Sequence, residues 1–414
     1  MAGYLITNVR IFDGSGREPF AGSVRVEGPR ITDVQAGTTR PAANGAAVID
    51  GRGGTLMPGL VESHAHIGLA DMTSYDLTRL PPEEHMLITV RNARLMLDCG
   101  YTSAFSAASP KPRLDVVLKR EIEAGRVPGP RVRANGPEIT VTGGLGDANL
   151  LHLPYHETPT FAWIADGPDA IRRVCRLLAR EGVDNLKLNL SGDLGTSSFP
   201  SEQTPMTDPE VAAAMEVAGA ARLRVAAHCR SNESVRMALR HGIDVIYHAN
   251  WVDERTLDAL EAARERVFVG PALAITYTLA QAGGQWGLGA ARAAEFQREL
   301  EASIDVIGQL RKRGVRVLPG GDYGFNYTPH GTYARDLWLF VKILGFSAAE
   351  TLVAATRLGG ELMGHPGELG VIKAGALADL LLVDGDPLAD IAILQERSAL
   401  RMIMKDGALH KHLA

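Results

Sequence analysis

Two histidines separated by one residue, His64 and His66, end a short apolar run that begins at Pro58. In an extended strand, residues i and i+2 point to the same side, so the two imidazoles would face one point. Two neutral imidazoles that converge in this way form half of a metal site. A pair of surface histidines is the alternative, and the position at the end of an apolar run favours the metal site.

Four more polar residues, Lys187, His228, His248 and Asp322, lie in or directly after apolar runs. Each has an ordinary explanation: a buried lysine paired with an acid, a hydrogen-bonded core histidine, or a turn aspartate beside glycines. Buried parallel strands are normally continuous apolar runs. Polar residues that recur at the same end of several such runs therefore favour a shared set of ligands.

Lys187 lies between leucines in the sequence Leu-Lys-Leu-Asn-Leu. An unpaired ammonium group inside a sheet carries a severe desolvation cost. Either a neighbouring acid pairs with it, or carbon dioxide carbamylates it, which reverses its charge and provides two oxygens able to bridge two divalent cations. The sequence leaves both alternatives open.

The elements that would position these residues alternate between strands and helices. The apolar, strand-like runs are 58–64, 101–106, 131–135, 185–190, 224–229, 243–248, 267–271 and 315–320. Helical patterns cover 83–98, 168–182, 208–222, 231–241, 253–265 and 291–313. This alternation predicts an α/β fold, a (β/α)8 TIM barrel with its site at the carboxyl ends of the strands. A doubly wound sheet is disfavoured because no Gly-x-Gly-x-x-Gly follows the first strand.

The two chain ends share a different style of short, β-branched runs with Asp-Gly turns, which is typical of β-hairpins. We expect residues 1–57 and 368–414 to form one small β-sandwich domain, and residues 58–367 to form the catalytic barrel.

Composition narrows the class of protein. The 414 residues are 45% hydrophobic and 22% charged, as in an ordinary globular chain. The net charge of −5 argues against a nucleic-acid partner, and three cysteines without a Cys-x-x-Cys pair argue against a thiolate zinc site. With neither a signal peptide nor a long apolar stretch in the sequence, we expect a cytoplasmic protein without a membrane partner.

Over essentially its whole length the chain resembles the metal-dependent amidohydrolase superfamily. The resemblance rests on residues 57–66 (MPGLVESHAH), on the four polar residues above, and on the tail at 370–387. Residues 139–144, 186–192 and 328–331 are most similar to the branch of imidazolonepropionase-related prolidases and N-acyl amino acid carboxypeptidases. Xenobiotic amide, carbamate and phenylurea hydrolases and ochratoxin-type amidases belong near this branch.

The resemblance implies that His64, His66 and Asp322 hold one metal ion, and that His228 and His248 hold a second. Carbamylated Lys187 would bridge two zinc ions, with manganese or cobalt as alternatives. Asp322 would be the catalytic general acid and base, taking a proton from the metal-activated hydroxide and passing it to the departing nitrogen.

Two departures from the branch bear on the reaction. Leu145 stands where the peptidases tend to have a histidine, and Arg230 stands where they tend to have a tyrosine. Deaminases of the superfamily carry a glutamate three residues after the histidine of strand five, where this chain has Ser231. Leu145 and Arg230 disfavour an Xaa-Pro dipeptidase or carboxypeptidase, and Ser231 disfavours a deaminase, so we expect hydrolysis of an amide, urea or carbamate C–N bond. A lactonase would use the same site and differ only in its substrate. The presence of all six ligand residues disfavours a non-catalytic scaffold.

The loops after the strands are rich in aromatic residues, which predicts an aromatic or N-acyl amino acid substrate, unless these loops pack on themselves. The aromatic loop residues are Tyr75, Tyr155, Phe161, Trp163, Phe199, Trp251, Tyr277, Trp286, Tyr323, Phe325 and Tyr327. As substrate-binding candidates we take Arg230, His330, Trp163, Tyr323 and Leu145. Relatives often form homo-oligomers, and we expect one here.

Overall fold

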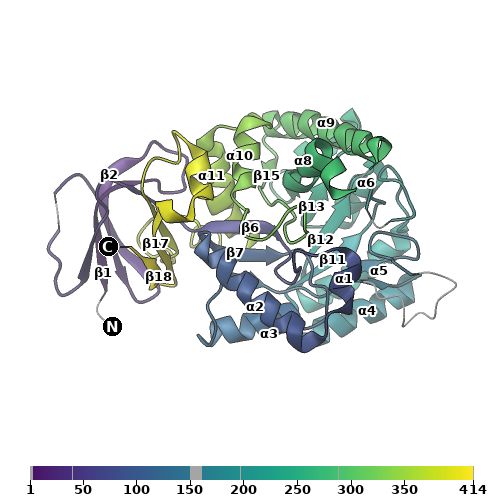
Figure 1. Cartoon of the computed structure of the whole chain (residues 1–414), viewed down its shortest axis with the longest axis horizontal. Coiled ribbons are helices and arrows are strands. Elements are labelled where there is room, and N and C mark those ends of the chain that lie inside the picture. The colour runs from purple at the N-terminus through teal and green to yellow at the C-terminus, as the bar shows by residue number, and fades with distance from the viewer. Residues whose placement is uncertain (1–2, 40, 150–160, 196, 288, 414) are drawn as a thin grey trace.

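The computed structural model describes residues 3–39, 41–149, 161–195, 197–287 and 289–413. Strands from both chain ends form one sheet, which lies beside the larger α/β part of the molecule (Figure 1). Its strands are β1 (Tyr4–Ile11), β2 (Phe20–Glu27), β3 (Arg30–Ala36), β4 (Ala47–Asp50), β5 (Thr55–Pro58), β16 (Leu380–Val383), β17 (Leu400–Lys405) and β18 (Ala408–His412). The antiparallel pair of β5 and β16 joins the two ends.

The eight strands from the two chain ends are hydrogen-bonded into one continuous sheet. The predicted two-sheet sandwich would have two separately hydrogen-bonded sheets. Strand β1 makes the single sheet possible by changing partners along its length. Residues 4–7 pair with β4, and residues 10–11 pair with β5. Between these stretches Asn8 has a left-handed backbone conformation with φ 54°, which interrupts the register and redirects the strand. The proposed division into residues 1–57 with 368–414 and residues 58–367 stays a prediction.

All eight predicted barrel strands occur, and they run parallel to their neighbours. They are β6 (Leu60–Ala65), β7 (Tyr101–Ser106), β8 (Arg131–Arg133), β11 (Asn185–Asn189), β12 (Arg224–Cys229), β13 (Val245–His248), β14 (Phe268–Gly270) and β15 (Arg316–Val317). Two further short strands, β9 (Glu138–Thr140) and β10 (Ala162–Ile164), pair in parallel with each other, and β9 also pairs with β11.

The parallel strands form a three-stranded sheet, β6-β7-β8, and a seven-stranded sheet, β10-β9-β11-β12-β13-β14-β15. The two sheets adjoin at both sides. The Asn185 amide N–H donates to the Ala134 carbonyl oxygen at 3.2 Å, next to β8 and β11. The Ser63 hydroxyl of β6 donates to the Pro319 carbonyl oxygen, beyond β15, at 2.7 Å. The strands thus follow each other around a barrel, with two places where the ladder is interrupted.

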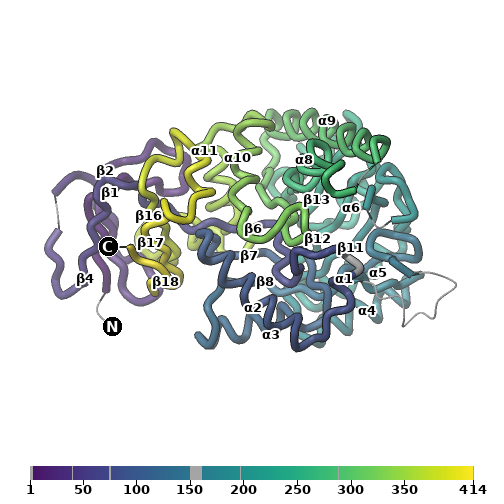
Figure 2. The backbone as a smooth tube through the Cα atoms, in the orientation of Figure 1, coloured from purple at the N-terminus to yellow at the C-terminus, as the bar shows by residue number. Residues whose placement is uncertain are grey.

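Helices cover the outside of these strands (Figure 2). The helical segments between residues 74 and 362 are α1 (Ser74–Arg79), α2 (Pro82–Asp98), α3 (Leu114–Glu123), α4 (Pro168–Glu181), α5 (Asp208–Ala221), α6 (Asn232–His241), α7 (Glu254–Ala262), α8 (Leu273–Ala282), η2 (Gly283–Trp286), α9 (Ala290–Lys312), α10 (Arg335–Lys342), α11 (Ala348–Val353) and α12 (Gly359–Leu362), with the π-helical turn η3 (Ala354–Leu358) before α12. None of the helices in the described part of the chain is both long and apolar enough to span a membrane.

The period of two along each strand separates the helix-facing side chains from those inside the barrel. In β11, Leu186 and Leu188 join the core shared with the helices. Lys187, between them, points to the other side. Inside the barrel, Val61, Phe105, Ala226 and Phe268 form a second apolar cluster from four strands. This packed layer supports the polar residues at the strand ends.

Candidate metal centre

The six predicted metal ligands meet at one cavity with a volume of about 490 Å³. Strand β6 supplies His64 and leads to His66, strand β15 leads to Asp322, and β11, β12 and β13 supply Lys187, His228 and His248. All six line the cavity, and apart from Asp322, whose side chain is 14% exposed, they are buried.

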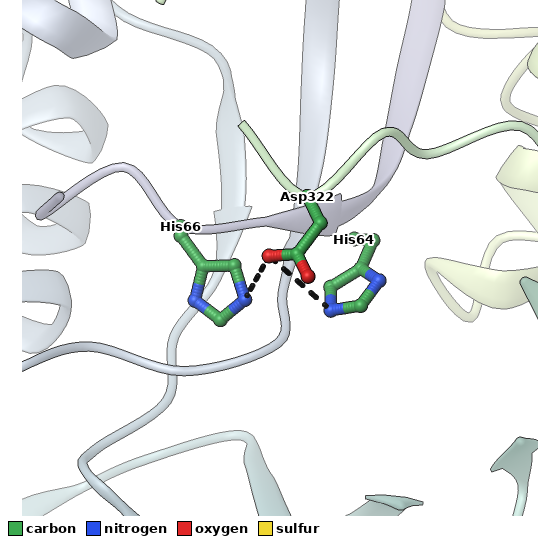
Figure 3. A group of neighbouring side chains, drawn as sticks. All are labelled: His64, His66 and Asp322. Carbon is green, nitrogen blue, oxygen red and sulfur yellow. Dashed lines mark ion pairs between the residues drawn. The ribbon is translucent and has the colours of Figure 1, made fainter. Parts of the chain in front are cut away.

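His64, His66 and Asp322 form the tightest group (Figure 3). Asp322 Oδ1 lies 3.2 Å from His66 Nε2 and 3.9 Å from His64 Nε2. One ligand atom from each residue lies within 4.8 Å of the others. Two imidazoles and a carboxylate at this spacing suit a divalent cation such as zinc.

The hydrogen bonds of the histidines leave nitrogens available for a cation. His66 Nδ1 lies 3.1 Å from the Ala108 carbonyl oxygen, which can only accept, so the neutral tautomer that fits this contact carries its proton on Nδ1 and offers the lone pair of Nε2 to a cation. His228 Nε2 lies 3.1 Å from the Gly192 carbonyl oxygen, which leaves Nδ1 free of a proton. Neither nitrogen of His64, nor Nδ1 of His248, has a hydrogen-bond partner among the described residues. Unpartnered buried nitrogens are costly, and bound cations would satisfy them.

The protonation states fit the same interpretation. Burial lowers the pKa of His64 and of His248 well below the ordinary histidine value, and it lowers the pKa of His228 to about 3. Burial alone would raise the pKa of Asp322, but the neighbouring His64 and His66 outweigh it and bring that pKa below its ordinary range. Neutral imidazoles and an ionised carboxylate are the forms that bind metals.

Lys187 has an acidic neighbour that the sequence did not single out. Its Nζ lies 3.7 Å from Oε1 of Glu138, at the start of β9, and 4.8 Å from the centre of the Tyr247 ring. The other oxygen of Glu138 accepts a hydrogen bond from Asn189 Nδ2 at 2.7 Å. The unmodified lysine thus has the acid partner of the first alternative, while carbamylation stays a prediction.

Unusual backbone conformations aim two of the candidate ligands. His248 has φ 77° and Asp322 has φ 60°, so both lie in the left-handed region that non-glycine residues rarely adopt. Such conformations cost on the order of 1–3 kcal/mol each and concentrate at functional sites. Here they turn the chain at the end of β13 and beyond β15, where the side chains enter the cavity.

The five substrate-binding candidates divide into two groups. Arg230 and Leu145 line the cavity. His330, Tyr323 and Trp163 do not belong to its described lining, so the structure does not support them as substrate contacts. His330 uses Nδ1 on the Tyr333 hydroxyl at 2.7 Å and Nε2 on the Leu69 carbonyl oxygen at 2.9 Å.

The other two candidates pack elsewhere. Tyr323 is buried against Tyr333, with ring centres 5.3 Å apart. Trp163, in β10, packs half-buried against the core shared with the helices.

The aromatic loops contribute to the cavity only in part. Phe161, Trp286, Phe325 and Tyr327 line it. Phe199, Trp251 and Tyr277 lie outside its described lining; Tyr155 and the Tyr75 side chain lie outside the described part of the chain. Apolar residues not singled out in the sequence complete the wall: Leu69, Leu194, Ile275, Leu279 and Phe296.

Comparison with known proteins agrees with this fold. Residues 55–409 match the Amidohydrolase family, so the chain belongs to it. Ochratoxinase of Aspergillus niger is 26% identical over 376 residues, covering 86% of this chain and 75% of the relative. Imidazolonepropionase of an Anaeromyxobacter species (strain K) is 26% identical over 392 residues, covering 87% and 83%.

Solved structures have the same architecture. A prolidase complexed with N-methylphosphonate-L-proline is 26% identical, with a TM-score of 0.89 and complete coverage of both chains. Phenylurea hydrolase B has a TM-score of 0.75 at 21% identity, covering 99% of this chain and 96% of that one, and shows the fold alone. The family and these hydrolases identify the chain as a hydrolytic enzyme with a TIM-barrel fold and an added sheet domain.

Proposed function

We propose that this enzyme hydrolyses the carbonyl C–N bond of an amide, urea or carbamate in a small aromatic or N-acyl amino acid substrate. The observation that carries the proposal is the set of buried, unpartnered imidazole nitrogens beside the Asp322 carboxylate, at the floor of a cavity with apolar and aromatic walls. Such a floor suits a divalent cation and such walls suit an aromatic group.

The ligands divide between two cation positions. His64, His66 and Asp322 would hold the first, and His228 and His248 the second, with carbamylated Lys187 between them. Zinc suits this set of nitrogen and oxygen donors, and manganese or cobalt would fit the same donors. A bound divalent cation supplies water with a pKa near 7 and a positive charge that polarises the carbonyl group.

Asp322 is the group that would move the proton. Its side chain lines the cavity, and its lowered pKa keeps the carboxylate ionised before reaction. It would accept a proton from the attacking water and donate it to the departing nitrogen. The apolar wall would hold the substrate's ring, so that the scissile bond lies at the metal-binding end of the cavity.

The structure provides an argument against deamination. Ser231, three residues after His228, is the residue in the position of the deaminase glutamate. Its hydroxyl accepts a hydrogen bond from the Ser234 amide N–H at 3.2 Å, which caps helix α6, and lies 2.6 Å from the Thr204 hydroxyl. It therefore supports the helix instead of offering a titratable group to the cavity.

The test is a panel of N-acyl amino acids, dipeptides, anilides, phenylureas and carbamates, assayed for amine release with added zinc. We expect turnover of at least one aromatic amide, urea or carbamate, which chelation abolishes. Lys187→Ala should remove most activity and lower the metal content, while the matched variant of an exposed lysine, Lys342→Ala, should change neither. Full activity and metal content in Lys187→Ala would contradict the bridging role, and a panel without any turnover would contradict the function.

A further inference from the structure

Arg230 is a buried cation at the cavity wall, held by three other side chains. Its side chain is 4% exposed. Nε donates to Oδ2 of Asp193 at 2.6 Å. Nη1 donates to Oδ1 of Asn250 and to Oε2 of Glu299, both at 3.1 Å. Asp193 follows β11 and Glu299 lies in α9, so the guanidinium group is fixed from two sides.

The other terminal nitrogen of Arg230, Nη2, lies outside this group of hydrogen bonds. Nη2 carries two N–H donors, and it makes no hydrogen bond to a described residue. Because Arg230 lines the same cavity as Asp322, a group of the substrate is the available acceptor. A single nitrogen with two protons donates to an oxygen atom, but it does not present the two-nitrogen fork that binds a carboxylate.

The charge around Arg230 also disfavours a carboxylate. Asp193 and Glu299 together bring two negative charges against one positive charge, so with both acids ionised the group carries a net charge of −1. The other basic residues of the described lining are paired as well. Lys187 lies beside Glu138, and Arg292 bonds Glu295 at 3.0 Å. Before a cation binds, no lysine or arginine among the described lining residues is left with an uncompensated positive charge, and the excess of negative charge beside Arg230 comes from Asp193 and Glu299.

We propose that Arg230 is a specificity-determining residue whose Nη2 donates to an uncharged oxygen acceptor of the substrate. The enzyme accordingly prefers uncharged amides, ureas or carbamates over analogues that carry a carboxylate beside the scissile bond. Glu299 is a positioning residue that also sets this preference through its charge. The inference rests on the proposed hydrolysis and narrows its substrate class.

The experiment uses three matched substrates at pH 8: an N-acylphenylalanine, its uncharged carboxamide, and the N-acylphenethylamine that lacks the acceptor group. We expect kcat/KM for the carboxamide to exceed that for the acid by about tenfold or more. It should also exceed that for the phenethylamine, because a hydrogen bond from a charged donor is worth roughly 10- to 150-fold.

Glu299→Gln is the decisive variant, because it keeps the size of the side chain and an oxygen that can accept from Arg230. The variant loses one negative charge beside Arg230. The ratio of kcat/KM for the acid to kcat/KM for the carboxamide should therefore rise by about tenfold or more. Glu301→Gln makes the same charge change two residues further along α9, on an exposed side chain. It should leave the ratio unchanged within about twofold.

The inference fails if the wild type prefers the acid, or if Glu299→Gln and Glu301→Gln give the same ratio while both melt like the wild type. With either of these two results, metal-dependent turnover of the acid or the carboxamide would still support the proposed hydrolysis. If none of the three is hydrolysed, the affinities of the acid and the carboxamide for the zinc-loaded protein decide the preference by calorimetry. A tighter-binding acid would then overturn the inference.

Discussion

Tyr247 is a support for the metal centre that can be tested separately from the ligands. Its ring is fully buried and stacks on His64, with ring centres 3.7 Å apart and an interplanar angle of 16°. Its hydroxyl donates to the Ser63 carbonyl oxygen at 2.7 Å. Because neither ring nitrogen of His64 has a hydrogen-bond partner among the described residues, this ring face is the contact that we expect to hold the imidazole in orientation.

Two substitutions of Tyr247 separate the hydroxyl from the ring. Tyr247→Phe leaves the stacked face but removes the donor from a buried carbonyl group, so it should lower the free energy of unfolding by about 1–3 kcal/mol. Zinc affinity should stay within about threefold of the wild type. Tyr247→Leu removes the face itself and should weaken zinc binding by about 10- to 100-fold, as changes in groups that orient metal ligands do.

Zinc dissociation constants from competition with a chromophoric chelator, together with urea unfolding of the same samples, measure both effects. Phe340→Leu is the matched control, because Phe340 is an equally buried ring in the core shared with the helices. It should lose stability and keep its zinc affinity. Wild-type zinc affinity in Tyr247→Leu would refute the role of the ring. Equal loss of zinc affinity in Tyr247→Phe and Tyr247→Leu would refute it as well.

Three further predictions concern the proton, a buried acid and the apolar wall. Asp322→Asn should lower kcat by about 100-fold or more in initial-rate assays, and a near-normal kcat would exclude the general acid–base role. Burial raises the pKa of Asp336 to about 6 from an ordinary 3.8, so the wild type loses stability as pH rises from about 4 to about 6. Asp336→Asn lacks this titration, so the difference in free energy of unfolding, variant minus wild type, should be about 1–1.5 kcal/mol larger at pH 8 than at pH 5. The same difference at both pH values in urea unfolding would contradict the raised pKa. Phe296→Ala should raise KM about tenfold or more for aromatic substrates but little for small aliphatic ones, and an equal change for both would show that Phe296 does not contact the ring.

The sequence was most informative where a residue type conflicted with its surroundings. The eight strands follow from apolar runs of the right length, and the six candidate ligands were visible because histidine, lysine and aspartate are rare at the ends of buried strands. Their convergence required only the topology, since the carboxyl ends of parallel barrel strands meet at one face.

The remaining features depend on contacts that no local pattern encodes. Glu138 lies in a strand of three residues, too short for a periodic signal, although its place before the apolar Ile139 could have drawn attention to it. His330 looks like a free polar residue in the sequence, yet the Leu69 carbonyl oxygen that accepts from it lies 261 residues away. Likewise Leu194, in the segment after β11, joins Leu279 of α8 and Phe296 of α9 in one apolar wall.

The most direct test of the metal centre is anomalous diffraction at the zinc absorption edge from crystals of the purified protein. We expect a peak within about 2.0–2.2 Å of ligand atoms of His64, His66 and Asp322, and a second peak near His228 and His248. Crystals that hold zinc elsewhere, or zinc-saturated protein without a peak among these residues, would contradict it.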